Sequence, residues 1–581
     1  MKTAALLAIM LILAATAANA QSGHMKILAV TDKVEGGKGM IADLYLEVKP
    51  GQGKVFIESF PLTKMDTQIS TRFAKEIACS ELDLECDQYD FFYTIKADTA
   101  LVGGPSAGAA AAVLTAAVVE GAATDESTAI TGTINSGGLV GPVGGLQEKI
   151  TASPERGVKK VLIAKGQRYV KSGNASNATI DLVAVGKENG VQVIEVVDMR
   201  EALYHFTGRQ YIEEDAQLSI DESYAETMQK VAESLCNKST QLMAGSNDTS
   251  ANNLTERGML AIKIGQYYSA ASYCFGANIR YKVLENANLT QEQVRTRAGK
   301  VVEDSTLLEN GLTRPKTVAD VQSYATVKER LLDATDTANL TLQRLQENKT
   351  RDAIALLAYA EERVYSAQAW AQFIGKDGQR FEPELIEKSC RSKLSEAEER
   401  YEYVKLFFPE TLAGTRRDID RAYDDLNAKR FELCLSKAAK AKAESDVILN
   451  TLGVEDSQVS ELVEKKLEIA KRTIVRNSKK GIFPILGYSY YEYANSLKDT
   501  DKYSALLYSE YALELSNMDV YFRKDKAEEA TPAEQKMAIV SPSILIFSAG
   551  LMTGAVIVFI LGKYTPKRNG KLVKKAALRR R

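Results

Sequence analysis

The chain has 581 residues, too many for one ordinary domain, and its apolar and charged fractions of 45% and 26% are those of globular proteins. Its net charge of −2 hides an asymmetry, since residues 563–581 contain nine Lys or Arg and no acidic residue. An acidic body with a basic tail argues against a nucleic-acid-binding protein and predicts a tail held at a membrane surface.

Residues 1–20 are predicted to be a secretory signal peptide. Lys2 precedes an apolar run from Ala4 to Ala15, and the Ala18-Asn19-Ala20 segment fits a cleavage site. The apolar run is short for a membrane span. The alternative is an uncleaved signal anchor, which leaves the next domain on the same side of the membrane.

Residues 25–208 are predicted to form a mixed α/β domain. Runs of β-branched and aromatic residues between turn residues predict strands at 40–48, 53–59, 90–96, 127–135, 159–165 and 191–197. Residues 70–82 and 106–121 have the spacing of helices, and the alanine-rich start of the second segment favours helix.

Residues 215–530 lack strand patterns and consist of long amphipathic segments. Four similar phrases mix small residues with aromatic and aliphatic ones, as packed helical hairpins require, at 265–277, 349–362, 428–441 and 501–514. Their spacing is irregular. We predict an α-helical hairpin array loosely like tetratricopeptide repeats, with an irregular helical bundle as the alternative.

The uncharged segment 538–562 is long enough to cross a bilayer as a helix. Because the basic segment 563–581 follows at once, the positive-inside rule predicts a cytoplasmic tail and an extracytoplasmic position for the preceding domains. A buried soluble helix is the alternative for 538–562. Gly550 and Gly554 form a G-x-x-x-G pattern, a weak indication of helix association.

Sequons and cysteines agree with an exterior location. Glycosylation sequons begin at Asn174, Asn177, Asn237, Asn247, Asn253, Asn288, Asn339 and Asn348. The six cysteines would pair naturally in chain order, as Cys79–Cys86, Cys236–Cys274 and Cys390–Cys434. Other connectivities and free core cysteines are alternatives. The sequence has no C-x-x-C or Cys/His cluster, so neither a metal site nor a cofactor is predicted.

The segment GGPSAGA at 103–109 contains a G-x-S-x-G pattern around Ser106, which is typical of a serine nucleophile. A Ser-His-Asp hydrolase would need a histidine after Ser106. The chain has two histidines, His24 beside the cleavage site and His205 in a segment that indicates packing, so this hypothesis is disfavoured. A phosphate loop is also disfavoured, because Ala109 stands where a Walker motif has lysine. A Gly-rich turn without chemistry is a further alternative.

A lysine can activate a serine if its amine is neutral near pH 7, which requires burial in an apolar setting. Lys149 follows a Gly/Pro turn and opens a predicted helix whose face carries Leu146 and Ile150. This setting favours a lysine base, although most lysines on helices are simply solvated.

The segments GGPSAGAAAAVLTAAV and TGTINSGGLVGPVGGLQEKITASPERGVKKVLIAKG resemble the proteolytic domain of Lon proteases. They are most similar in character to its archaeal, membrane-associated members. The Pro-Ser-Ala-Gly motif, the T-G-x-(I/L) motif, the glycine turn and the lysine-bearing helix follow in the family's order. The strand predicted at 53–59 also resembles the strand that leads into the family's active site. The resemblance covers about residues 25–205.

The resemblance implies that Ser106 is the nucleophile, Lys149 the general base, and Thr131 a residue that positions the lysine amine. For Thr131, a structural strand residue is the alternative. Backbone amides of Ser106 and Ala107 at the start of a helix would stabilise the oxyanion. The resemblance also implies polypeptide substrates and, since such domains commonly form rings, a homo-oligomer.

The sequence departs from the family at three points. Gly103 stands where many Lon proteases have an acidic residue, and Gly137-Gly138 replace a basic or polar residue, which predicts a more mobile hairpin. The ATPase module that feeds substrates to Lon has no counterpart in this sequence. We therefore predict an ATP-independent Ser-Lys endopeptidase, tethered by one span and facing the exterior, that cleaves flexible or unfolded polypeptides. The alternative is a catalytically inactive surface scaffold or binding glycoprotein with a Lon fold.

Overall fold

The computed structural model describes most of the chain between residues 21 and 522. The described residues are 21–31, 37–63, 65–84, 86–102, 104–171, 179–211, 217–375, 379–406, 408, 412–451, 454, 456–517 and 522. The predicted signal peptide, membrane span and basic tail lie outside them, as do Gly103, Asn174 and Asn177. Within the described residues, no helix combines the length and the apolar character that crossing a bilayer requires.

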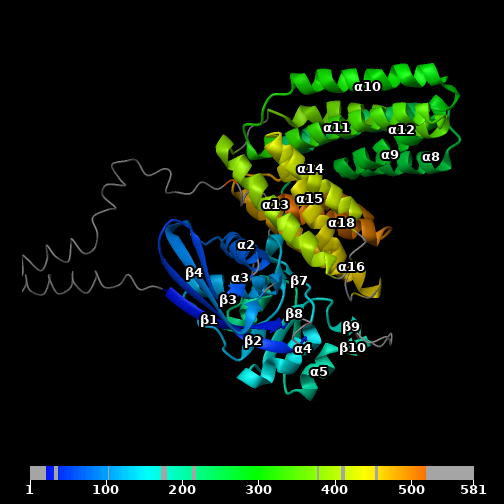
Figure 1. The fold of residues 1–581 in the computed structure, drawn as a ribbon. Helices are drawn as coiled ribbons and strands as arrows, with labels where there is room; N and C mark the ends of the chain where they lie inside the picture. Colours follow the sequence, from blue (N-terminus) through cyan, green and yellow to red (C-terminus); the bar gives the residue numbers. More distant parts are fainter. Residues whose placement is uncertain are drawn as a thin grey trace, which may run out of the picture. The chain divides into compact units, whose positions relative to one another are not determined.

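A seven-stranded mixed sheet organises the amino-terminal part of the chain (Figure 1), with strand order β11-β8-β5-β1-β2-β4-β3. The pairs β1/β2 and β2/β4 are antiparallel, and the other neighbours are parallel. The strands are β1 (Gln21–Val30), β2 (Gly39–Pro50), β3 (Val55–Thr63), β4 (Tyr89–Val102), β5 (Thr128–Ile130), β8 (Lys160–Ala164) and β11 (Gln192–Val196).

Helices and two small hairpins complete this α/β part. The helices are α2 (Met65–Glu81), α3 (Gly108–Val119), α4 (Leu146–Ala152), α5 (Leu182–Glu188) and α6 (Met199–Thr207), and the hairpins pair β6 (Thr133–Ile134) with β7 (Val140–Gly141) and β9 (Tyr169–Lys171) with β10 (Thr179–Asp181). Helix α3 is buried from its first residue to Val118, because its alanines let α2, α6 and the sheet approach closely.

Two features of the sheet differ from the sequence-based prediction. Strand β1 lies at the centre of the sheet, but Gln21, Ser22 and Gly23 at its start conceal the pattern of a strand. The strand predicted at 127–135 is divided, because Gly132 leaves the sheet to hydrogen bond with the turn that carries Ser106.

The rest of the described chain is helical, as predicted. Its helices are α7 (Glu222–Met243), α8 (Thr249–Lys263), α9 (Tyr267–Glu285), α10 (Gln291–Gly311), α11 (Val318–Gln346), α12 (Thr350–Trp370), α13 (Pro383–Lys405), α14 (Ala413–Asn427), α15 (Phe431–Asn450), α16 (Val459–Lys479), α17 (Ile485–Leu497) and α18 (Lys502–Ser516).

The helices form four units of three. In each unit the last two helices pack as a hairpin, and the first packs beside them: α7–α9, α10–α12, α13–α15 and α16–α18. The four phrases noted in the sequence form the last helix of each unit. Three of the hairpin turns contain a residue with positive φ: Gly265 (77°), Asn348 (57°) and Lys429 (58°). The first helices are nearly equal in length, at 21 to 23 residues, whereas the second helices range from 13 to 29 residues, which accounts for the irregular spacing in the sequence.

Three disulfides join the cysteines in chain order. Cys79–Cys86 joins α2 to the turn before β4. Cys236–Cys274 joins α7 to α9, and Cys390–Cys434 joins α13 to α15. The last two therefore join the first and third helices of their units.

The sequon asparagines within the described residues all have exposed side chains. They are Asn237, Asn247, Asn253, Asn288, Asn339 and Asn348. Their positions leave room for the attachment of a glycan at each one, and the occupancy of these sites stays a prediction.

Candidate active site

Ser106 lies in the 3-10 turn Pro105–Ala107, which joins β4 to the amino-terminal end of α3. The preceding Gly104 has a φ of 100°, a conformation that favours glycine. The hydroxyl of Thr67 at the start of α2 donates to the carbonyl of Gly104 at 3.3 Å. The side chain of Ser106 is half-buried, so the turn presents a serine that solvent still reaches.

The turn is fixed to the segment that follows β5. The amide of Gly132 donates to the carbonyl of Ser106 at 3.0 Å, and the amide of Ala109 donates to the carbonyl of Gly132 at 3.1 Å. A Cβ on Gly108 would lie 3.2 Å from the nitrogen of Ile134, so glycine is what permits this close approach. The nucleophile turn and the residue after Thr131 are thus held together through the backbone.

Lys149 approaches the same segment from α4. This helix begins after Gly145, which has a φ of 69°, and Lys149 is only 3% exposed. Its Nζ donates to the Oγ1 of Thr131 at 3.0 Å, and Thr131 is fully buried. The structure therefore brings Thr131 and Lys149 together, in the relation that the resemblance implied.

Burial lowers the pKa of Lys149 to about 7. Among the described residues, no carboxylate forms an ion pair with its amine, and the nearby charge of Glu148 offsets only part of the cost of burying the charge. At neutral pH a large fraction of this lysine is therefore the uncharged amine, the form that can accept a proton.

No hydrogen bond joins the Oγ of Ser106 to the Nζ of Lys149, although the structure describes both residues. The two are connected through Thr131, which contacts the lysine, and Gly132, which holds the turn of Ser106. Catalytic hydrogen bonds are often long in the absence of substrate and shorten when it binds.

Both histidines of the chain are engaged elsewhere. In β1, the Nε2 of His24 lies 2.9 Å from Asp43 Oδ1, and its Nδ1 lies 2.9 Å from Glu126 Oε2. His205 lies in α6 with its ring 5.5 Å from that of Tyr204. Within the described part of the chain, neither hydrogen bonds to Ser106, which leaves Lys149 as the candidate base.

The β6–β7 hairpin between Thr131 and Lys149 is enclosed, which corrects the prediction of a mobile hairpin. Gly137 and Gly138 are both buried. A Cβ on Gly137 would lie 2.6 Å from Ile469 of α16, and one on Gly138 would lie 3.0 Å from side-chain atoms of Glu81 and Met199. A polar side chain at either position would collide with these neighbours.

Residues that the sequence did not single out hold this part of the site. Gln167 binds both backbone groups of Val143, donating at 2.8 Å and accepting at 3.0 Å. The helical region adds the hydroxyl of Tyr403, which accepts from the amide of Gly144 at 3.1 Å, and Arg400, which donates to Asn135 Oδ1 at 2.8 Å. Gln167 directly follows the turn after β8, and a polar residue at the end of a predicted strand could have been noted in the sequence as a candidate site residue. Tyr403 and Arg400 had none, because they lie in a different region of the chain.

The α/β part is similar to known proteins over a limited range. Residues 76–196 match the family model of the Lon protease (S16) C-terminal proteolytic domain. The chain is 32% identical over 127 residues to a Lon protease of Paraburkholderia phytofirmans, which covers 21% of this chain and 16% of that protein. It is 36% identical over 104 residues to the archaeal Lon protease of Archaeoglobus fulgidus, which covers 18% of this chain and 15% of that protein.

The chain thus spans less than a fifth of the length of these relatives. The chain is likewise similar to only part of a Lon protease of Methanosarcina barkeri, with 29% identity over 157 residues. The matched range contains Ser106, Thr131 and Lys149 and none of the helices from α7 onward. The part of the chain that carries the candidate site is therefore similar to the serine protease domain of the Lon family.

Proposed function

We propose that the protein is an ATP-independent serine endopeptidase that uses Ser106 and Lys149. The observation that carries this proposal is the buried amine of Lys149, which is hydrogen bonded to Thr131 beside the backbone segment that fixes the turn of Ser106. The similarity of residues 76–196 to a Lon proteolytic domain supports the same reaction class.

The proposed reaction is acyl transfer. Neutral Lys149 takes the proton of Ser106 Oγ as that oxygen attacks the peptide carbonyl carbon, and the resulting lysinium then gives the proton to the leaving amine. A water then attacks the ester carbon of the acyl-enzyme and gives its proton to Lys149; the bond from that carbon to Oγ breaks, and the lysinium returns the proton to Ser106 Oγ. The backbone amides of Ser106 and Ala107, at the amino-terminal end of α3, are our candidates for stabilising the oxyanion.

Substrates are proposed to be flexible or unfolded polypeptides. The chain has no Walker motif, so it supplies no visible motor that could unfold a stable protein. A homo-oligomer is proposed from the family resemblance alone.

The full-length protein in detergent tests the proposal through a fluorescent serine-directed fluorophosphonate and through hydrolysis of unfolded casein, with and without ATP. We expect labelling and ATP-independent cleavage, no labelling of Ser106→Ala, and a loss of at least about 1,000-fold in cleavage for Lys149→Ala. Lys159→Ala removes an exposed lysine of the same domain and should leave both signals unchanged. Native protein that labels no better than Ser106→Ala would favour the inactive scaffold instead.

An extracytoplasmic location is supported by the three disulfides, which form and persist in oxidising compartments. The signal peptide, the span at 538–562 and the cytoplasmic tail are part of this proposal. In intact cells, a cysteine introduced into 563–581 should resist a membrane-impermeant maleimide, and added protease should cleave near exposed Asn247. The opposite pattern would reverse the proposed topology.

A further inference from the structure

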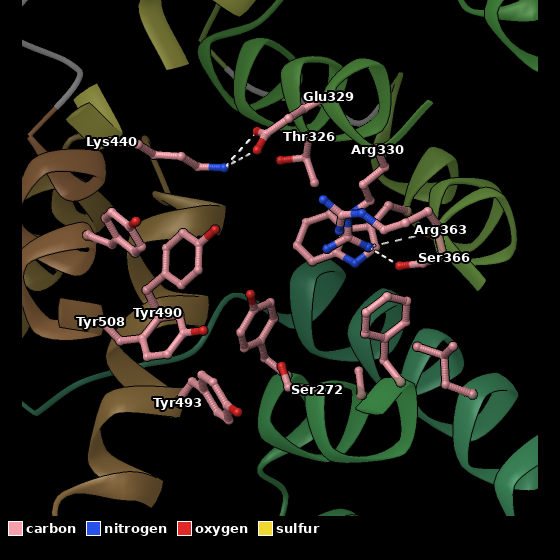
Figure 2. A pocket seen from close by; sticks show the side chains of 16 residues that line it. Ser272, Thr326, Glu329, Arg330, Arg363, Ser366, Lys440, Tyr490, Tyr493 and Tyr508 are labelled. Atoms are coloured by element: carbon pink, nitrogen blue, oxygen red, sulfur yellow. Dashed lines mark hydrogen bonds and ion pairs between the residues drawn. The ribbon is translucent and has the colours of Figure 1, made fainter. Parts of the chain in front are cut away.

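The helical region forms a partly open cavity of about 320 Å³ that the proposed reaction does not use. Figure 2 shows it between helices of several three-helix units. Its lining is Leu235, Tyr268, Ala271, Ser272, Phe275, Thr326, Glu329, Arg330, Arg363, Ser366, Trp370, Lys440, Tyr490, Tyr493, Tyr508 and Tyr511. The size is at the lower end of the range for small-ligand sites, which is about 300 to 1,000 Å³.

One wall of the cavity is aromatic. Tyr490, Tyr493 and Tyr508 come from α17 and α18, and in Figure 2 they lie across the cavity from Arg330 and Ser366. The ring of Tyr268 lies 6.0 Å from that of Trp370 and 5.7 Å from that of Tyr490, so aromatic faces continue around the cavity. Such a wall suits a flat or bulky apolar group.

Two of the three cationic side chains in the lining are neutralised. Lys440 Nζ lies 2.6 and 2.7 Å from the two carboxylate oxygens of Glu329. Arg363 Nε donates to Asp333 Oδ2 at 2.6 Å, and the hydroxyl of Tyr359 donates to the same oxygen at 2.7 Å. These pairs account for every carboxylate that the lining offers.

Arg330 is the exception. Its Nη1 donates to the hydroxyl of Ser366, and its guanidinium lies 4.8 Å from the centre of the Trp370 ring. No carboxylate of the described residues forms an ion pair with it. Burial and the nearby charge of Arg363 lower the pKa of Arg330 to about 10, so it keeps its charge at neutral pH. Glu329, whose two oxygens bind Lys440, acts on Arg330 only at a distance. Among the described residues the cavity therefore holds one guanidinium with no carboxylate in direct contact, an arrangement that is costly unless a ligand supplies an anion.

We propose that this cavity binds the carboxyl-terminal residue of a polypeptide, with the α-carboxylate on Arg330 and a large apolar or aromatic side chain against the tyrosine wall. A guanidinium has five N–H donors in a fork that matches a carboxylate, and Ser366 occupies only part of it. The ligand would place one negative charge where the cavity has one positive charge in excess.

The charged and polar side chains of the lining also disfavour other anionic ligands. A free amino acid would bring an ammonium group, and the only carboxylate of the lining, that of Glu329, already binds Lys440 with both oxygens. An acidic sugar needs many hydrogen bonds from amide and carboxylate side chains, and the lining contains no Asn, Gln or Asp. A phosphate dianion would need a second unpaired cation.

Peptide binding measures this inference separately from the proposed peptidase activity. The probe is a fluorescein-labelled pentapeptide that ends in phenylalanine, prepared as the free acid and as the C-terminal amide. Fluorescence anisotropy is recorded with the full-length Ser106→Ala protein in detergent, so that cleavage plays no part. We expect the acid to bind about 10- to 100-fold more tightly than the amide, which is the range for a hydrogen bond to a charged group.

Arg330→Gln keeps a hydrogen-bonding side chain but removes the charge, and it should abolish the difference between acid and amide. Arg351→Gln is the matched control, because Arg351 is an exposed arginine of α12 outside the lining, and it should keep the difference. If Arg330→Gln fails to fold, the comparison of acid and amide on the parent protein still decides. Equal affinities, no binding of either peptide, or equally tight binding of phenylalanine or glucuronate would overturn the proposal.

Discussion

At the scale of single residues, the candidate chemistry depends on where one lysine is buried. Lys149 is enclosed by its own helix, the turn before it and Thr131, and its amine has a single side-chain partner with no charge. A surface lysine has a pKa near 10.4 and cannot serve as a base at neutral pH. In the proposed reaction, the neutral amine that results from this apolar setting would take the place of the histidine in Ser-His-Asp hydrolases.

The pH dependence of cleavage tests this interpretation. Because the pKa of Lys149 is about 7 and the reactive form is the neutral amine, kcat/KM should rise with pH and reach half its maximum near pH 7. Below that point it should fall about tenfold per pH unit. The measurement is kcat/KM on a fluorogenic peptide between pH 5 and 10. A midpoint near pH 10 would indicate a solvated lysine, and a profile without a rising limb would show that this group does not titrate in the reaction.

At the scale of elements, the β6–β7 hairpin links the two catalytic candidates and is held by the helical region. It lies between Thr131 and α4, so a displacement of the hairpin would move Lys149 relative to Ser106. Tyr403 contacts the turn that leads into α4, and Arg400 contacts Asn135 beside the hairpin. A change of about 1 Å in such a geometry can cost a large factor in rate.

Tyr403→Phe removes the hydroxyl that accepts from the Gly144 amide and leaves the ring in place. We expect kcat to fall about 3- to 10-fold with KM nearly unchanged, since one buried hydrogen bond contributes about 1 kcal/mol. Tyr401→Phe changes a buried tyrosine of the same helix α13 and should behave like the parent protein. Steady-state kinetics with the fluorogenic peptide measure both variants. An equal loss in both would mean that α13 acts only through stability.

The sequence predicted individual helices and strands better than the long-range contacts between them. The alanine-rich helix after Ser106, the lysine-bearing α4 and the all-helical character of the later chain follow from short-range patterns, and the structure contains them. Strand β1 was missed, because its polar first residues obscure a strand that tertiary pairing on both sides stabilises. The contacts of Tyr403 and Arg400 could not be predicted, since a single sequence gives no signal for pairs separated by 259 and 265 positions.

At the scale of the whole molecule, the described residues all belong to one compact unit. Contacts between the α/β part and the helices are polar as well as apolar: Arg476 Nη1 lies 2.6 Å from Glu81 Oε2, and Arg472 hydrogen bonds to Asp198. Two disulfides lie within helical units and the third lies within the α/β part, and they close loops of different lengths, which predicts unequal losses of stability when each is removed.

Replacing Cys236 and Cys274 by serine, or Cys390 and Cys434, should lower stability by about 4 kcal/mol each, since these disulfides close loops of 38 and 44 residues. The loop of 7 residues closed by Cys79–Cys86 should contribute only about 2 kcal/mol. Scanning calorimetry of the three double variants at one pH and scan rate makes the comparison. A larger effect for the short loop would show that its disulfide acts on native geometry rather than on the unfolded chain.

Gly137 has a consequence for how this protein could have evolved. With a φ of 71° and Ile469 only 2.6 Å from the site of a Cβ, the position accepts no side chain while α16 is docked. A homologous protease domain with a larger residue there could not be transplanted onto these helices without a compensating change at Ile469. The residue at position 137 and the side chain at position 469 are therefore coupled, and a larger residue at one position would require a smaller one at the other.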